Sequence, residues 1–235
     1  MDDLQKLISG YVLDSNNKKD LKDSQIVLLV GPTGSGKNTI LNELLKTNKF
    51  EEVISHTTRM PRKNRGILER DGREYHFISN DQAIDMLKNH DFIEVAYTHG
   101  CLYGTSISEV KKATNKNKIA VADVDVKGVR SFRYLSNSIT AIYLLPPNFD
   151  ILIERLKNRY SNSNDALKDI RKRLTTALYE LKELLNSDYY HIVVNKDIQG
   201  ASKTVLKIID GQQYPSNEGR SVAKSLINDI NNYLG

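Results

Sequence analysis

The stretch Ile26-Val27-Leu28-Leu29-Val30-Gly31-Pro32-Thr33-Gly34-Ser35-Gly36-Lys37-Asn38-Thr39 carries the strongest structural signal in the chain. Its apolar first part predicts a buried β-strand, and the pattern after it predicts a glycine-rich turn that opens a helix. Glycines let the backbone bend so that several N–H groups point into one cavity, and a helix N-terminus adds partial positive charge there. Lys37 adds a full charge. The stretch therefore predicts a nucleotide-binding phosphate loop formed by Gly31, Pro32, Thr33, Gly34, Ser35, Gly36, Lys37, Asn38 and Thr39.

One position of this loop departs from the usual pattern. Asn38 stands where a serine or threonine ordinarily supplies a hydroxyl to Mg²⁺, and Thr39 follows one residue later. The pattern thus predicts nucleotide binding and leaves the protein ligand of the metal open.

Composition places the chain among ordinary globular proteins. Its 235 residues are 39% hydrophobic and 27% charged, enough for one substantial core with small additional lobes. The net charge of +5 would suit a nucleic-acid partner, but no aromatic residues are interleaved with the basic ones, and we expect no nucleic acid to bind.

Cysteine content and hydropathy bear on the compartment. Cys101 is the single cysteine, which fits a reducing compartment. No secretory signal is visible, and no apolar run approaches the ~20 residues of a membrane span. We expect a cytoplasmic protein without a membrane partner.

Hydrophobic periodicity predicts alternating strands and helices beyond the phosphate loop. The predicted strands are 26–30, 53–54, 92–96, 119–124, 139–145 and 191–194, and the predicted helices include 81–89, 106–115, 126–135, 149–159 and 165–186, with a further helix ending near 210. Such alternation favours an α/β fold with a parallel sheet flanked by helices. Short amphipathic helices are expected near both ends of the chain.

A series of motifs, in collinear order, resembles the guanylate kinase family. Thr57-Thr58-Arg59 with Pro61-Arg62 is followed by Asp71-Gly72 and Tyr75-His76-Phe77, with extra residues within 63–68. The later motifs are Phe92-Ile93-Glu94, Tyr103-Gly104-Thr105, Asp123-Val124-Asp125, Arg155 to Arg159, Arg171-Lys172-Arg173-Leu174 and Val193-Val194-Asn195. The resemblance implies a P-loop nucleoside-monophosphate kinase fold over residues 25–210. It further implies a GMP-binding lobe at about 55–104 and a lid at about 155–175, leaving 1–24 and 211–235 as extensions.

The resemblance also implies a GMP site. Its expected members are Ser55, Arg59, Arg62, Tyr75, Glu94, Tyr103, Thr105 and Asp125. Arginine forks and tyrosine hydroxyls suit a doubly charged monophosphate. A carboxylate such as that of Glu94 matches the ring N–H and amine of guanine, a donor pair that adenine lacks, so it would favour guanine by a few kcal/mol.

Catalytic and ATP-binding roles follow from the same resemblance. The expected catalytic residues are Lys37, Arg59, Arg155, Arg159 and Arg173; because the lid is longer than usual in the family, Arg171 could take the place of Arg173. Asn195 is expected near adenine. Mg²⁺ is expected to arrive with ATP and to be held through water by Thr39 and Asp123.

These features predict a Mg²⁺-dependent enzyme that phosphorylates GMP, and dGMP, from ATP by in-line transfer. Two other interpretations stay open: a catalytically silent module for protein interactions, and a related kinase with another acceptor, suggested by the insertion at 63–68. The retained Lys37 and lid arginines favour the enzyme. A monomer and a homodimer are equally compatible with the sequence.

Overall fold

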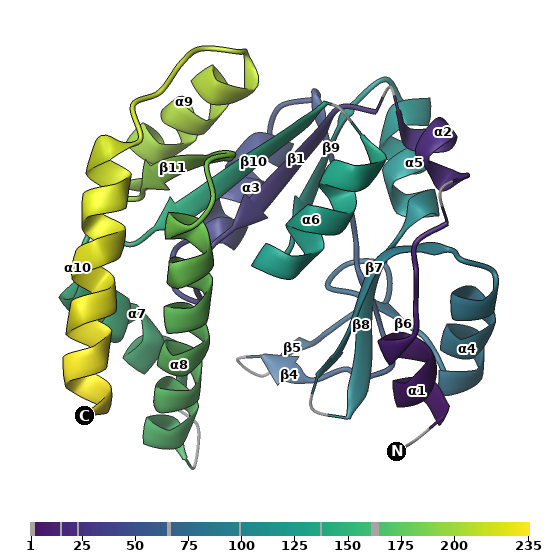
Figure 1. The fold of residues 1–235 in the computed structure, drawn as a ribbon, viewed down its shortest axis with the longest axis horizontal. Helices are drawn as coiled ribbons and strands as arrows, with labels where there is room; N and C mark the ends of the chain where they lie inside the picture. Colours follow the sequence, from purple (N-terminus) through teal and green to yellow (C-terminus); the bar gives the residue numbers. More distant parts are fainter. Residues whose placement is uncertain are drawn as a thin grey trace. The chain divides into compact units, whose positions relative to one another are not determined.

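The computed structural model describes residues 3–14, 16–22, 24–64, 67–98, 100–136, 138–160 and 165–235. Its helices are α1 (Asp3–Ser9), α2 (Asn17–Leu21), α3 (Lys37–Leu45), α4 (Asn80–Lys88), α5 (Ile107–Asn115), α6 (Val126–Leu135), α7 (Phe149–Tyr160), α8 (Ala166–Leu185), α9 (Ile198–Ile209) and α10 (Asn217–Leu234) (Figure 1). Its strands are β1 (Ile26–Val30), β2 (Phe50–Glu52), β3 (His56–Thr57), β4 (Lys63–Asn64), β5 (Ile67–Leu68), β6 (His76–Phe77), β7 (Phe92–Thr98), β8 (Cys101–Ser106), β9 (Ile119–Asp123), β10 (Ile139–Leu145) and β11 (Tyr190–Val194).

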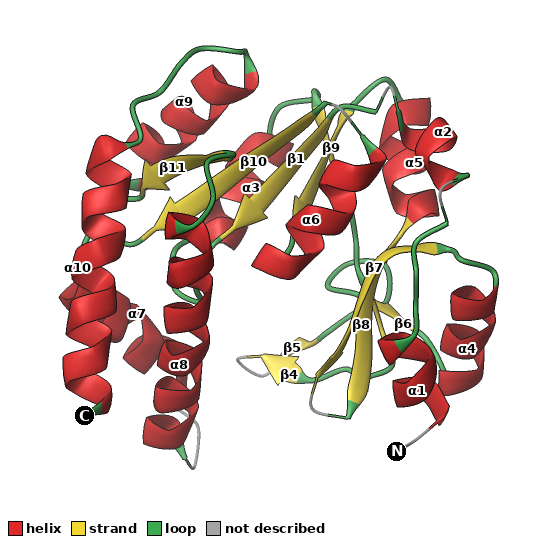
Figure 2. Cartoon of the chain, viewed as in Figure 1, coloured by secondary structure: helices red, strands yellow, loops and turns green. Residues whose placement is uncertain are grey.

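The main sheet confirms the predicted fold class. Its strand order is β11-β10-β1-β9-β2, and the pairs β10–β11 and β2–β9 are parallel. Figure 2 shows these strands with helices beside them. Every residue of β1 is buried, as expected for a strand of a parallel sheet that is covered on both faces.

A second, mixed sheet of order β6-β3-β8-β7 was not predicted as such, because β3, β6 and β8 were missed. In this sheet β8 pairs antiparallel with both β3 and β7, while β6 pairs parallel with β3. The β8 sequence is short, partly polar and interrupted by Gly104, so it lacks an apolar alternation. The glycine is required by packing: a Cβ there would lie 2.9 Å from the carbonyl oxygen of Glu94.

Two compact units make up the chain. Unit 1 comprises Met1–Ile26, Phe50–Ala122 and Lys127–Ile139, and unit 2 comprises Val27–Lys49, Asp123–Val126 and Thr140–Gly235. The predicted N-terminal extension thus belongs to unit 1, together with the whole expected GMP lobe. The expected C-terminal extension belongs to unit 2, together with the phosphate loop and the lid.

In unit 1, α1 contacts α4 and β7, and Leu4 of α1 is buried. Within the expected N-terminal extension lies also the short helix α2, which contacts α5. The first strand after α3 was expected at 53–54 and lies at Phe50–Glu52 instead; Val53 donates its backbone N–H to the Val121 carbonyl at 2.8 Å.

In unit 2, α10 packs along α8 and against β11, and α7 contacts both helices (Figure 1). The packing is tight at Gly219 of α10, where a Cβ would lie 2.3 Å from the Ile192 side chain of β11. The helix α8 buries an apolar stripe at helical spacing: Ile170, Leu174, Ala177, Leu181 and Leu184.

Parts of two predicted features fall outside the described residues: 65–66 in the insertion and 161–164 in the lid loop. Among the helices that the structure describes, none combines the length and the apolar character that crossing a membrane requires.

Candidate active site

Unit 1 brings together three residues expected to recognise guanine. Thr105 donates its hydroxyl to Oε1 of Glu94 at 2.7 Å, and the Ser55 hydroxyl lies 3.3 Å from that of Thr105. Glu94 on β7 and Thr105 on β8 are register partners, which places their side chains on the same face of the sheet. Since the single proton of the Thr105 hydroxyl is used on Glu94, Ser55 is the donor between the two hydroxyls.

Asp125, predicted as a fourth member of this group, belongs to unit 2. There its charge contributes to the environment of Glu180, as described below.

The residues expected to bind the acceptor phosphate also gather in unit 1. Arg59 donates from Nε to the Tyr103 hydroxyl at 3.1 Å, and its guanidinium carbon lies 5.3 Å from the centre of the Tyr75 ring. The two tyrosine rings meet edge to face with centroids 5.9 Å apart. Arg62 is exposed; its backbone N–H donates to Glu69 at 2.8 Å.

Glu69 is a member of this cluster that the sequence analysis missed. Its carboxylate lies 2.8 and 3.2 Å from the two terminal nitrogens of Arg59, and both side chains are only 8% exposed. Burial by itself lowers the pKa of Arg59, but Glu69 reverses that effect and the pKa lies above its ordinary value. The pair therefore holds a permanently charged guanidinium in a fixed orientation.

The insertion at 63–68 explains how Glu69 reaches this place. Its described parts, β4 and β5, pair antiparallel, and the Glu69 N–H donates to the Arg62 carbonyl at 2.9 Å. The chain thus returns after the insertion beside its starting point. Had the sequence analysis predicted a hairpin over the insertion, it would have placed Glu69 close to Arg59.

In unit 2, the phosphate loop has the predicted strand–turn–helix form. Gly31, Gly34 and Gly36 all have positive φ, at 137°, 90° and 101°. A Cβ at Gly31 would lie 2.2 Å from the Leu144 carbonyl oxygen, so this position excludes any side chain. The Lys37 ammonium donates to the Gly31 carbonyl and lies 3.8 Å from the Asp123 carboxylate, which places a cation at the mouth of the loop.

Asn195 and Arg155 hold the loop by its carbonyl oxygens. The amide of Asn195 donates to Ser35 at 2.8 Å, and Arg155 donates to Gly34 at 3.1 Å. A peptide whose carbonyl is held on one side presents the next N–H on the other, as an anion-binding loop requires. Asn195 is only 2% exposed, so the contact seen here supports the loop, and its expected place near adenine stays a prediction.

The lid arginines differ in their surroundings. Arg173 donates from Nε to the Tyr160 hydroxyl at 2.9 Å, whereas Arg171 donates to the Leu234 carbonyl at the end of α10 at 2.6 Å. Because Arg171 is held at that helix end, the geometry favours Arg173 for the expected catalytic role. Arg159 is exposed and lies near enough to Asp123 to affect its pKa.

Asp123 and Thr39 are the residues whose chemistry suits the expected metal. Desolvation raises the pKa of the Asp123 carboxyl, against the opposing attraction of Lys37 and Arg159. Carboxylate and hydroxyl oxygens are the hard donors that Mg²⁺ takes, and Mg²⁺ commonly needs only one or two of them beside phosphate and water. Asn38 is exposed on the first turn of α3.

Glu180 of α8 is a second residue that the sequence analysis missed. Burial raises its pKa to about 7, Lys37 and Arg173 oppose the rise, and Asp125 and Asp123 add to it. The signal was an acid at helical spacing from the buried Ala177 and Leu184. Glu180 thus joins the charged groups around Lys37.

Comparisons with known proteins bear on the family of the chain. The family model "Guanylate kinase" matches residues 23–212. Guanylate kinase 1 of Oryza sativa subsp. japonica is 33% identical over 209 residues, which cover 87% of this chain and 53% of that protein. The guanylate kinase of Prochlorococcus marinus subsp. pastoris is 34% identical over 192 residues, which cover 81% of this chain and 98% of that protein.

The chain therefore spans about half the length of the rice relative and nearly all of the bacterial one. A solved structure with the same fold is that of guanylate kinase from Anaplasma phagocytophilum, with a TM-score of 0.60 and 23% identity; the match covers 88% of this chain and 94% of that one. Together with the extent of the family match, these relatives show that the chain belongs to the guanylate kinase family.

Proposed function

We propose that this chain is an active guanylate kinase that transfers the γ-phosphoryl group of ATP to GMP, giving ADP and GDP. The observation that carries the proposal is the presence of two polar groups on one sheet: the acceptor Glu94 with Thr105 at one end, and the donors Tyr103 and Arg59 at the other. Tyr103 and Thr105 are two residues apart on β8, hence on the same face and about 6.6 Å apart along the strand. One face of the sheet thus offers groups for the guanine base and groups for the phosphate, at a separation that one nucleotide can span.

The residues of unit 1 select and hold the acceptor. Glu94 accepts from the ring N–H and the amine of guanine, with Ser55 and Thr105 orienting its carboxylate. Arg59, Tyr75, Tyr103 and Arg62 neutralise and orient the phosphate dianion. dGMP lacks only a ribose hydroxyl, so the same contacts admit it.

The residues of unit 2 hold the donor and stabilise the transfer. The phosphate loop and Lys37 bind the β- and γ-phosphates, and Arg155, Arg159 and Arg173 balance the charge of the transferring group. A GMP phosphate oxygen bonds to the γ-phosphorus while the bond to the bridging oxygen breaks, and ADP leaves with that oxygen. Asp123 and Thr39 would hold Mg²⁺ through water, and the ion would supply further charge neutralisation.

The cellular setting and assembly belong to the same proposal. The single cysteine, Cys101, supports a reducing cytoplasmic setting, and the proposed partners are ATP and GMP, without nucleic acid or membrane. The chain would act as a monomer or as a homodimer.

A coupled assay of ADP release with GMP, dGMP, AMP, UMP and CMP tests the proposal. We expect turnover with GMP and dGMP and at least about 100-fold lower kcat/KM with the others, equivalent to ~2.7 kcal/mol. Lys37→Ala removes the cation of the loop and should lower kcat by at least about 100-fold. Lys46→Ala is the control. Lys46 directly follows α3, and its exposed side chain pairs with Glu43, so its loss should leave kcat unchanged.

Asn38 is the observation that favours the alternative, a catalytically silent interaction module. If the folded chain releases no ADP above the Lys37→Ala background with any acceptor, the alternative replaces the proposal.

A further inference from the structure

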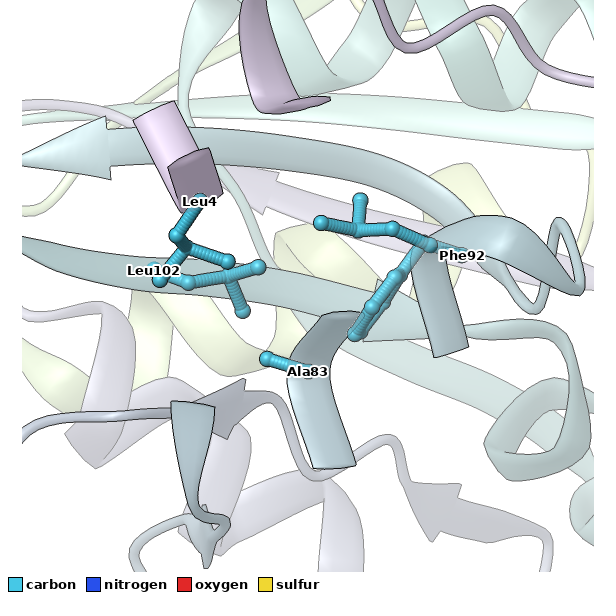
Figure 3. Close-up of a cluster of buried hydrophobic side chains, with 5 residues drawn as sticks. Leu4, Ala83, Phe92 and Leu102 are labelled. Carbon is cyan, nitrogen blue, oxygen red and sulfur yellow. The ribbon is translucent and has the colours of Figure 1, made fainter. Parts of the chain in front are cut away.

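The N-terminal segment, residues 3–14, completes the core of unit 1, although the family match begins only at residue 23. Leu4 is 2% exposed and belongs to a buried cluster with Ala83, Leu87, Phe92 and Leu102. Figure 3 shows these side chains gathered from α1, α4, β7 and β8. The segment is therefore held against the strand that carries Glu94.

Tyr11 binds the backbone at the start of that strand. Its hydroxyl donates to the carbonyl oxygen of Phe92 at 2.6 Å and accepts from the N–H of the same residue at 3.1 Å. In the sheet order β6-β3-β8-β7, β7 is an edge strand. The Tyr11 hydroxyl thus hydrogen-bonds to both the N–H and the carbonyl of Phe92, on the side of β7 where the described sheet ends.

Two other contacts fix the turn that precedes β7. The Asn17 side chain donates to the His90 carbonyl at 2.9 Å, and the His90 ring lies 3.1 Å from the Val12 carbonyl oxygen. His90 has a φ of 56°, a left-handed conformation that is costly for a residue other than glycine and needs support from its surroundings. Val12 of the N-terminal segment and Asn17 of α2 supply that support.

The place held by Tyr11 is where the register of β7 against β8 shifts. Phe92 pairs with Ser106 while Glu94 pairs with Thr105, so β7 carries one extra residue at Ile93. Successive side chains of a strand point to opposite faces, so such a shift decides which face the next residue uses. The position of Phe92 therefore bears directly on where the Glu94 carboxylate points.

We propose that Tyr11 is a positioning residue for acceptor recognition, an inference that rests on the proposed function. Its hydroxyl holds Phe92 at the register shift, so that the Glu94 carboxylate meets the N–H groups of guanine. Burial raises the pKa of Tyr11 to about 12. The hydroxyl therefore keeps its proton throughout the neutral range, and both hydrogen bonds persist there.

Tyr11→Phe in the full chain tests this role, because it removes the hydroxyl and keeps the ring. We expect KM for GMP to rise at least fivefold, with kcat and KM for ATP within twofold of wild type. The preference for GMP over inosine monophosphate, which lacks the amine read by a carboxylate, should fall at least threefold. Amide exchange of Phe92 should quicken.

Leu4→Ala is the matched control, since it weakens the same segment without touching the Phe92 backbone. We expect it to lower the melting temperature at least as much as Tyr11→Phe does and to leave KM for GMP within twofold. Wild-type KM and preference in Tyr11→Phe would overturn the role. The role would also be overturned if KM for GMP rose in both Tyr11→Phe and Leu4→Ala in proportion to their loss of melting temperature, because the effect would then be one of general stability.

Calorimetric binding of GMP separates this inference from the proposed function. If the wild-type chain binds GMP but does not phosphorylate it, the proposed function fails, and the GMP affinities of the same variants decide the role of Tyr11 by the same fivefold criterion. If the wild-type chain does not bind GMP, both proposals fall.

Discussion

At the scale of single residues, unit 2 holds two side chains whose charge and chemistry depend on their surroundings. Glu180 would be fully ionised at neutral pH in water, but burial raises its pKa to about 7, so its charge is only partly present there. Asn38 replaces a hydroxyl by a larger carboxamide at the start of α3. A substitution at each of these two residues gives a separate prediction.

Glu180→Gln should make stability less dependent on pH. Below about pH 4.5 Glu180 is protonated in both the folded and the unfolded chain, so it costs nothing. As pH rises from about 4.5 to 7 the unfolded chain ionises while the buried group in the folded chain keeps its proton, so the wild type loses up to about 3 kcal/mol over that range. Urea unfolding at pH 5 and pH 8 should show the variant gaining much more stability over wild type at pH 8 than at pH 5.

Glu154→Gln, at an exposed position of α7, serves as the control and should differ from wild type by less than about 0.5 kcal/mol at both values. An equal gain for Glu180→Gln at pH 5 and pH 8 would contradict the raised pKa.

Asn38→Ser restores the usual hydroxyl of the phosphate loop. Mg²⁺ commonly keeps several waters and few protein ligands, so we expect kcat to change by less than about tenfold, or ~1.4 kcal/mol. Steady-state kinetics at saturating Mg²⁺ measure this. A gain of about 100-fold would mean that the loop of this chain is impaired, and would favour the silent module.

At the scale of elements, the phosphate loop depends on a close approach between its glycines and Asn195. A Cβ at Gly36 would lie 2.2 Å from the amide nitrogen of Asn195. That nitrogen donates to Ser35, so any side chain at Gly36 would displace the bond that holds the loop.

Gly36→Ala should therefore raise KM for ATP at least about tenfold, while Gly211→Ala serves as the matched control. Gly211 also has a positive φ, of 84°, but a Cβ there would meet nothing within 4 Å. The control should cost only the backbone strain, about 1–2 kcal/mol of stability, and leave KM for ATP unchanged. Equal values of KM in the two variants would show that the Asn195 contact does not shape the loop.

The elements also show what the sequence could and could not predict. β1 and the phosphate loop were predicted because their signal is local: an apolar run, glycines and a helix start within a few residues. β8 was missed because its sequence is partly polar and is interrupted by Gly104, whose missing side chain admits the backbone of Glu94 on the paired strand β7. Glu69 was missed because its partner, Arg59, is reached only when the chain turns back after the insertion.

At the scale of the whole molecule, the two units should respond separately to the two nucleotides. Binding stabilises the region that makes the contacts, by about 2.7 kcal/mol at a ligand concentration 100 times Kd. By hydrogen exchange, GMP should slow the amides of β3, β7 and β8 in unit 1, and ADP should slow those of the phosphate loop in unit 2. Protection of the phosphate loop alone by GMP would contradict the assignment of the acceptor to unit 1.

The burial of Leu4 against Phe92 and Leu102 has a consequence for the order of events during synthesis. A ribosome adds about 5–20 residues per second, so Leu4 waits roughly 5–20 s before Leu102 has been made. During that interval the apolar residues of α1 lack their partners. Residues 3–14 thus leave the ribosome well before the residues that bury Leu4, and chaperone contact with this segment during that interval would follow from the architecture of unit 1.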